Sequence, residues 1–198
     1  MDTWSIIALV FMVGLFAIAL ISGQAFLPAH ASKIDRLTFI WFAFDALTHF
    51  IIEGSFLYHS TFGRTVLTGT GLFADMWKDY AQADLRWGFA DSTIVAVELM
   101  TVVFSGSMCL YVLYLLHRND PTRHLWIIVL SVFELIGGWF TFVPEWLDGS
   151  KYLTTDNFLY LYIYLAFFNL LWVVIPVALS YRSYNIIVGS LRKNIKSE

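Results

Sequence analysis

The chain has 198 residues, of which 59% are hydrophobic and only 14% are charged, and its formal net charge is −3. Soluble domains carry about 25% charged residues, so this composition excludes an ordinary soluble globular protein. No basic run is long enough to bind nucleic acid, and the single cysteine, Cys109, excludes a disulfide framework within the chain. The composition predicts an all-α, polytopic membrane protein.

Five apolar segments are each long enough to cross about 30 Å of hydrocarbon at about 1.5 Å per residue. They cover residues 4–27, 37–58, 93–116, 125–143 and 158–181. Residues 29–31 mimic a signal-peptidase site, but no basic segment precedes the first apolar run, so we interpret that run as a retained helix. We therefore expect one transmembrane domain, a five-helix bundle, with a tail over residues 182–198.

The lysine and arginine residues outside the spans predict the orientation of the bundle. Eight of them fall on the side that holds the C-terminal tail, and four fall on the other side. The positive-inside rule then places the C-terminus in the cytosol and the N-terminus outside it.

The longest connection, residues 59–92, lies on the side away from the tail. Within it, residues 73–80 predict a short amphipathic helix at the membrane surface. Two interpretations of this helix stay open. It is either an interfacial helix with no further role or a cover over a binding site.

Polar groups inside the spans are the strongest functional signal, because an ionisable group at membrane depth costs at least a few kcal/mol. In the second span, Asp45, His49 and Glu53 are four residues apart and share one helical stripe. Further polar or amphipathic side chains lie inside the other spans: Glu98, Thr101, Glu134, Asn169 and Trp172. Their positions along the helices predict one polar pocket between the membrane centre and the side away from the cytosol.

Most of these side chains also have a structural explanation, as hydrogen-bonding or packing groups between helices. Asp45, for example, can simply hold His49 in one tautomer. The trio His49, Glu53 and Glu98 is harder to explain in this way, so we interpret it as functional. A lone histidine without a second one at metal-ligand spacing is a weak metal signal, and no serine or cysteine nucleophile stands beside a base.

Two desolvated carboxyl groups and an imidazole suit proton transfer, because burial lets one acid stay protonated while its partner acts as a base. An aromatic face beside them can stabilise a developing cation. Such a set suits the migration of a double bond by alkene protonation followed by proton loss.

Four motifs follow one another along the chain: His-x-x-x-Glu-Gly at 49–54, Trp-Lys-Asp-Tyr at 77–80 with Asp-x-Arg at 84–86, Glu-x-x-Thr at 98–101, and Asn-x-x-Trp at 169–172. In this order and spacing they resemble the emopamil-binding protein family, the sterol Δ8–Δ7 isomerases of the endoplasmic reticulum. The resemblance extends over about residues 35–182.

The resemblance implies five transmembrane helices around a sterol-binding cavity. It assigns proton donation and abstraction to His49, Glu53 and Glu98. It assigns the orientation of these groups to Thr101 and Asn169, and the stabilisation of the carbocation to Trp172. We expect further substrate contacts from the remaining side chains around this set: Asp45, Trp77, Tyr80, Trp87 and Glu134.

The chain departs from the family pattern around this set. Trp87 stands where the family usually has a tyrosine, and Glu134 stands where glutamine is usual. Asp45 occupies a position where we expect a small or neutral residue, and Leu85 replaces a small polar one. These changes surround an intact proton-transfer set, so they concern the substrate more than the type of reaction.

The sequence therefore predicts a membrane isomerase that protonates C9 of a Δ8-sterol, forms a cation at C8 and removes a proton from C7. No cofactor or metal is expected, since nothing is oxidised overall. Two alternatives stay open: an isomerase of another polycyclic terpenoid, and a non-catalytic protein that binds sterols or cationic amphiphiles. A proton-coupled transporter is disfavoured by the small number of spans and the lack of an inverted repeat.

The expected partners follow from this prediction. They are the lipid bilayer, a sterol or related terpenoid substrate, and cationic amphiphilic amines that act as inhibitors. No nucleic acid is expected, and a homodimer is left open.

Overall fold

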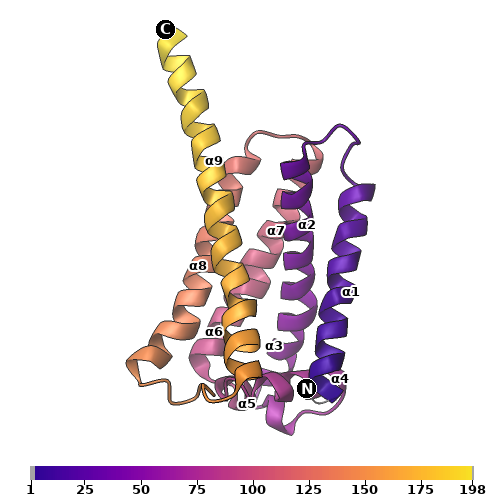
Figure 1. Ribbon diagram of the computed structural model, residues 1–198, viewed down its shortest axis with the longest axis vertical. Coiled ribbons are helices and arrows are strands. Elements are labelled where there is room, and N and C mark those ends of the chain that lie inside the picture. Colours follow the sequence, from indigo (N-terminus) through magenta and orange to yellow (C-terminus); the bar gives the residue numbers. More distant parts are fainter. Residues whose placement is uncertain (1–2, 198) are drawn as a thin grey trace.

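The computed structural model describes residues 3–197, and within that range it contains helices but no strand (Figure 1). Five helices are long and apolar enough to cross a membrane. They are Thr3–Ala25, Lys33–Ser60, Ser92–His117, Arg123–Leu147 and Leu159–Ile195. Each overlaps the span predicted at the same place, so the all-α fold with five membrane spans is confirmed.

Three of the five spans contain a π-helical segment. The second span consists of α2 (Lys33–Leu47), η1 (Thr48–Glu53) and α3 (Gly54–Ser60), and the third of α6 (Ser92–Met100), η3 (Thr101–Ser105) and α7 (Gly106–His117). The fifth begins as η4 (Leu159–Phe168) and continues as α9 (Asn169–Ser197), whereas α1 (Thr3–Ala25) and α8 (Arg123–Leu147) are uninterrupted. π-Helical turns are rare and occur often at functional sites. Each one here contains or adjoins a residue that the sequence proposes for catalysis.

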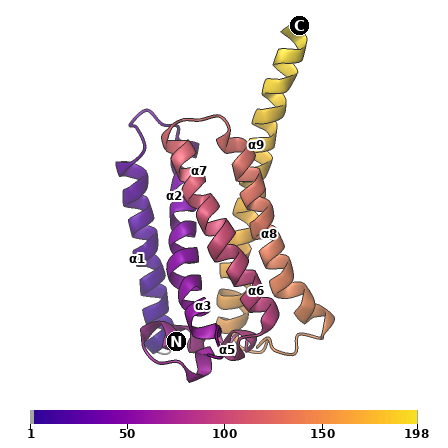
Figure 2. The same ribbon diagram turned by 180° about the vertical axis from the view of Figure 1, so that it is seen from behind.

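The spans pack side by side as a bundle (Figures 1 and 2). α8 lies along α9, α1 lies along α2, and α2 also packs against α7. The C-terminal part of α9 extends beyond the other helices in Figure 1, so the segment predicted as a tail continues this helix as far as Ser197.

Apolar packing holds together the half of the bundle that includes the α1–α2 and α7–α8 connections. Its buried side chains come from four spans and include Phe42, Val112, Ile127 and Leu130. Burying a side chain of this kind contributes about 1.5–3 kcal/mol relative to leaving it in water. Most of the polar residues proposed from the sequence, among them Glu53 and Glu98, lie in the opposite half, which we call the polar half.

The connection between the second and third spans folds over that polar half of the bundle (Figure 1). It contains η2 (Val66–Thr68), α4 (Leu72–Tyr80) and α5 (Arg86–Phe89), so the helix predicted at residues 73–80 is present. Arg86 anchors the connection from a buried position. Its Nη2 donates to Asp84 Oδ2 at 2.6 Å and to the carbonyl oxygen of Thr141 on α8 at 2.6 Å.

Candidate active site

A pocket of about 210 Å³ lies in the polar half of the bundle. Its wall combines aliphatic and aromatic side chains with polar groups from four spans. Ten of the eleven residues proposed from the sequence line it: His49, Glu53, Trp77, Tyr80, Trp87, Glu98, Thr101, Glu134, Asn169 and Trp172. The eleventh, Asp45, is fully buried and lies behind the wall.

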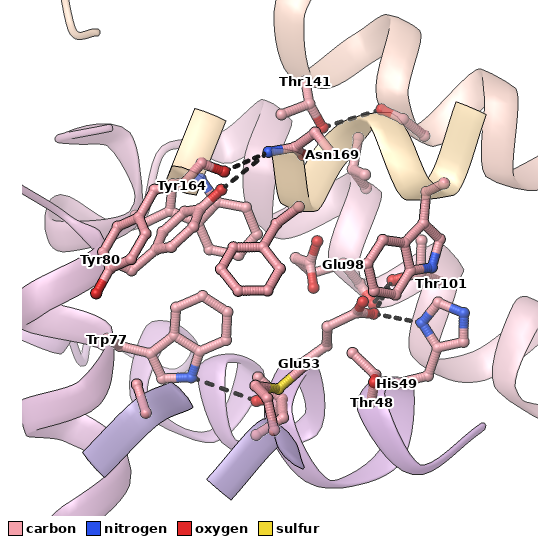
Figure 3. Close-up of a pocket in the computed structure, with 18 of the residues that line it drawn as sticks. Thr48, His49, Glu53, Trp77, Tyr80, Glu98, Thr101, Thr141, Tyr164 and Asn169 are labelled. Atoms are coloured by element: carbon pink, nitrogen blue, oxygen red, sulfur yellow. Dashed lines mark hydrogen bonds and ion pairs between the residues drawn. The ribbon is translucent and has the colours of Figure 1, made fainter. Parts of the chain in front are cut away.

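His49, Glu53 and Thr101 form one hydrogen-bonded set (Figure 3). His49 Nδ1 lies 2.6 Å from Glu53 Oε2, one turn further along the same helix. Thr101 is the first residue of η3, and its Oγ1 atom donates to the same carboxyl oxygen at 2.6 Å. Two donors on one oxygen fix the Glu53 carboxyl group and stabilise its ionised form.

Glu98 lies on the neighbouring span and points into the same space as Glu53 (Figure 3). The side chain is buried, and its Oε2 atom has no hydrogen-bond partner among the described residues. A buried charge without a partner is expensive, so this environment favours the neutral acid. The two carboxyl groups therefore have different environments, as an acid and a base require.

The second ring nitrogen of His49 faces two more carboxyl groups. Its Nε2 atom lies 3.3 Å from Asp45 Oδ1 and 3.4 Å from Glu134 Oε1. Among the described residues, no lysine or arginine forms an ion pair with these acids. The imidazole is therefore the basic group that links the acids of the second span to the acid of α8.

Asp45 joins His49 to two further side chains. Trp172 Nε1 donates to its Oδ1 atom at 2.7 Å, and Cys109 Sγ donates to its Oδ2 atom at 3.3 Å. Ligand-type atoms of Asp45, His49 and Cys109 all lie within 4.8 Å of one another, a set that resembles the ligands of a transition metal. Both Asp45 oxygens already accept hydrogen bonds, so a metal would have to displace these donors.

An aromatic wall closes the pocket on the side of the α4 connection. Trp77 and Trp87 stack with ring centroids 4.9 Å apart and an angle of 3° between their planes. The Tyr80 ring meets both indoles edge to face, and burial raises the pKa of its phenol well above the usual value. Phe73 and Met76 of α4 also line the pocket, so the position of this helix favours the interpretation as a cover.

Asn169 lines the pocket, and its side-chain amide contacts backbone oxygens of its own span. Its Nδ2 atom donates to the carbonyl oxygens of Tyr164 and Leu165 at 3.0 Å and lies 3.5 Å from the Tyr80 hydroxyl (Figure 3). The amide therefore satisfies backbone oxygens at the end of the π-helical segment η4. It contacts the aromatic wall, whereas Thr101 is the side chain that contacts Glu53.

Sequence reasoning missed Asp79 as a residue of the pocket. The Tyr164 hydroxyl donates to Asp79 Oδ2 at 2.5 Å, and Ser5 Oγ on α1 donates to the same atom at 3.0 Å. Asp79 and Tyr164 both line the pocket. The signal was present, since Asp79 stands at the acidic position of the Trp-Lys-Asp-Tyr motif.

Comparison with known proteins agrees with this geometry. The family model described as EXPERA (EXPanded EBP superfamily) matches residues 72–183. The chain belongs to this family. It is 30% identical over 195 residues to a 3-beta-hydroxysteroid-Delta(8),Delta(7)-isomerase of Cavia porcellus, a match that covers 96% of this chain and 82% of that protein.

Other similar proteins carry the same isomerase name or a different enzyme name. A probable 3-beta-hydroxysteroid-Delta(8),Delta(7)-isomerase of Arabidopsis thaliana is 31% identical over 153 residues, covering 77% of this chain and 67% of that protein. An isomeliandiol synthase of Ailanthus altissima is 26% identical over 165 residues, covering 82% of this chain and 77% of that protein. The predicted family is confirmed, and the chain is an isomerase in a multi-pass membrane fold.

Proposed function

We propose that this membrane isomerase moves the ring double bond of a Δ8-sterol to the Δ7 position. The observation that carries the proposal is the bonded set of His49, Glu53 and Thr101 beside the buried acid Glu98, whose Oε2 atom has no hydrogen-bond partner among the described residues. These groups lie in a pocket with a largely apolar wall, where a sterol ring can exclude water. Relatives named for the same isomerisation support the choice of substrate.

The environments of the two carboxyl groups suggest a division of roles. Glu98 starts neutral and gives its proton to C9, which leaves a tertiary cation at C8. Glu53, hydrogen-bonded to His49, then removes a proton from C7, and the remaining electron pair forms the Δ7 double bond. The site is left with Glu98 ionised and the Glu53–His49 pair protonated, so return of one proton between the neighbouring acids restores it.

The cation at C8 needs stabilisation from fixed groups, because water would convert it to an alcohol. Trp172 lines the pocket beside the carboxyl groups. An indole face within about 6 Å of a desolvated cation contributes roughly 2 kcal/mol or more. The nearby acids add to this attraction.

The pocket volume of about 210 Å³ is smaller than the roughly 300–1,000 Å³ of common small-molecule sites. We propose that it receives the reacting rings, while the rest of the sterol lies against the apolar side chains of α1 and α9. Ala8, Leu9 and Met12 of α1 and Val173 of α9 supply that surface.

The labelling pattern of the product tests the proton-transfer mechanism. Turnover in D2O is expected to place deuterium at C9, because the carboxyl protons exchange with water. A mechanism that shifts hydride within the substrate would leave the product unlabelled. NMR of the isolated product distinguishes the two results and would reject the acid–base roles in the second case.

A second candidate is the isomerisation of another polycyclic terpenoid. The departures Trp87 and Glu134 lie in the pocket wall, and relatives include an isomeliandiol synthase and a protoglabretal synthase. The purified protein incubated with a Δ8-sterol and a panel of polycyclic terpenoids decides between them. We expect a Δ7-sterol by mass spectrometry and NMR. Turnover of a terpenoid alone would overturn the proposal that the substrate is a Δ8-sterol. Binding without any turnover would overturn the proposal that the protein is an enzyme.

We further propose that the protein resides in the membrane of the endoplasmic reticulum, with the N-terminus in the lumen and the C-terminus in the cytosol. The distribution of lysine and arginine around the spans supports this orientation. Protease protection of tags at the two ends in sealed microsomes tests it. Cleavage of the N-terminal tag, but not of the C-terminal tag, from outside would reverse the orientation.

A further inference from the structure

The Trp172 indole forms a hydrogen bond with Asp45, a residue that does not line the pocket. The indole lines the pocket, and its Nε1 atom donates to Asp45 Oδ1 at 2.7 Å. Asp45 is 0% exposed and lies behind the indole, away from any ligand in the pocket. Trp41 and Phe44 of α2 pack against the same indole, with centroids 5.4 and 6.2 Å from it. The ring is thus held at its polar edge and by two aromatic neighbours.

Three donors around the Asp45 carboxyl stabilise its ionised form and oppose the effects of burial and of the nearby Glu134 carboxyl. Three side chains lie within hydrogen-bond or ion-pair distance of its oxygens, and each can donate: Trp172 Nε1 at 2.7 Å, Cys109 Sγ at 3.3 Å and His49 Nε2 at 3.3 Å. An indole N–H can only donate, so the Trp172 bond needs an acceptor oxygen at Asp45. Glu134 adds negative charge on the other side of His49, which lies between the two acids.

A carboxylate bonded to an indole N–H changes what the ring offers to a ligand. The anion draws the N–H proton toward itself and pushes electron density into the π system, and such polarisation is stronger where water is excluded. The face of an aromatic ring attracts cations because its quadrupole is negative there. A more electron-rich indole therefore attracts a positive charge in the pocket more strongly than an indole bonded to a neutral group.

We propose that Asp45 is a positioning residue that acts through Trp172. It holds the indole by its N–H group and strengthens the ring as a site for positive charge. The charge is the ammonium group of a cationic amphiphile or, resting on the proposed function, the carbocation at C8.

Paired ligands that differ only in charge test this inference on the full-length protein in detergent. One probe is a quaternary ammonium amphiphile, and the other is its carbon analogue with the nitrogen replaced by carbon. Asp45→Asn keeps an oxygen that can accept from the indole but removes the charge. We expect the preference for the ammonium probe to fall by about 3- to 10-fold, with the affinity for the carbon analogue unchanged within about 2-fold. An equal loss for both probes would show that Asp45 only supports the fold and would overturn the proposal.

A double-mutant cycle separates an effect through the ring from a direct effect of charge. In the Trp172→Phe protein, the ring has no N–H group for Asp45 to polarise. Adding Asp45→Asn should then change the preference for the ammonium probe by less than about 2-fold. If the loss in this background equals the loss in the native protein, Asp45 acts by direct Coulomb attraction and the role through Trp172 is wrong.

The binding assay tests the role of Asp45, and the turnover assay tests the proposed function, so one proposal can be rejected without the other. The probes do not react, so the proposed isomerisation can be absent while the dependence on Asp45 and Trp172 is intact. Conversely, normal conversion of the Δ8-sterol with no change of preference in Asp45→Asn would reject this inference and leave the proposed function standing.

Discussion

The first span is more apolar than the second, but the second is more deeply buried. α1 has a mean hydropathy of 2.7 over its most apolar window, and 17% of that window is buried. The second span has a mean hydropathy of only 1.3, and 61% of its window is buried. The most apolar helix therefore lies at the edge of the bundle, and the least apolar one lies inside it. In a bilayer, a helix that carries acids must place them where other side chains supply partners.

The largest expected effect concerns one acid of the second span and one of the third. Glu53→Gln and Glu98→Gln should each lower turnover by about 10²–10⁴-fold, because glutamine keeps the shape but cannot transfer a proton. Binding of a substrate analogue should stay close to native. Asp75→Asn is the control, since this carboxyl pairs with Lys78 at the surface of α4.

Near-native turnover in both glutamine variants would show that neither acid is needed for proton transfer. Glu53 and Glu98 would then be structural. Proton transfer would have to be reassigned, with Glu134 and Asp45 as the next candidates, since both lie beside His49.

Helical spacing and hydropathy were sufficient to predict the spans and the polar stripe. Asp45, His49 and Glu53 lie four residues apart, and the structure brings His49 into contact with both acids. The five helices were predictable because apolar runs of this length have few alternatives to crossing a membrane. Thr101 was also placed near the acids, although its bond to Glu53 needed the structure.

Contacts between distant segments were beyond the reach of the sequence pattern. The π-helical segments shift the faces of three spans, and neither hydropathy nor spacing reveals a single added residue in a turn. Asn169 directly follows such a segment, and its amide contacts the carbonyl oxygens of Tyr164 and Leu165 and the Tyr80 hydroxyl. Asp79 was missed because its partners, Ser5 and Tyr164, lie 74 and 85 residues away along the chain.

The second largest effect should come from the connection that follows the second span. Arg86→Met removes the cation between Asp84 and Glu145, whose oxygens lie 2.6 and 3.8 Å from its guanidinium nitrogens. Breaking a buried ion pair on one side costs about 3–5 kcal/mol, so we expect a marked fall in melting temperature. Arg64→Met is the control, because Arg64 belongs to the same connection and its guanidinium group lies over the Tyr58 ring of α3. Equal melting temperatures for both variants would show that Arg86 does not anchor this segment.

A smaller effect should follow from the hydroxyl that bridges the second and third spans. Thr101→Val keeps the shape of the side chain but removes the donor to Glu53, which lies 2.6 Å away. A hydrogen bond to a charged group contributes about 1.5–3 kcal/mol, so turnover should fall by at least about 10-fold. Thr141→Val is a matched control in the same pocket, because Thr141 donates to the Gly137 carbonyl oxygen of its own helix. If the two valine variants are equally active, the bond between the spans does not position Glu53.

The smallest expected effect tests whether α1 is bound to the bundle along one face only. Gly23 lies against Ile40 of α2, and a Cβ atom added there would lie 2.7 Å from Ile40 Cγ1. Gly14, on the same helix, has no such neighbour within 4 Å among the described residues. Alanine favours a helix over glycine by about 1 kcal/mol, so Gly14→Ala should be neutral or slightly stabilising. At Gly23 the same change must push the two helices apart, and overpacking costs roughly 1–3 kcal/mol, so a net loss of about 1 kcal/mol is expected. Thermal unfolding of the two variants in the same detergent measures the difference. Equal stability would mean that α1 does not pack closely on α2 at this point, and that the contrast between the two spans extends around the whole circumference of α1.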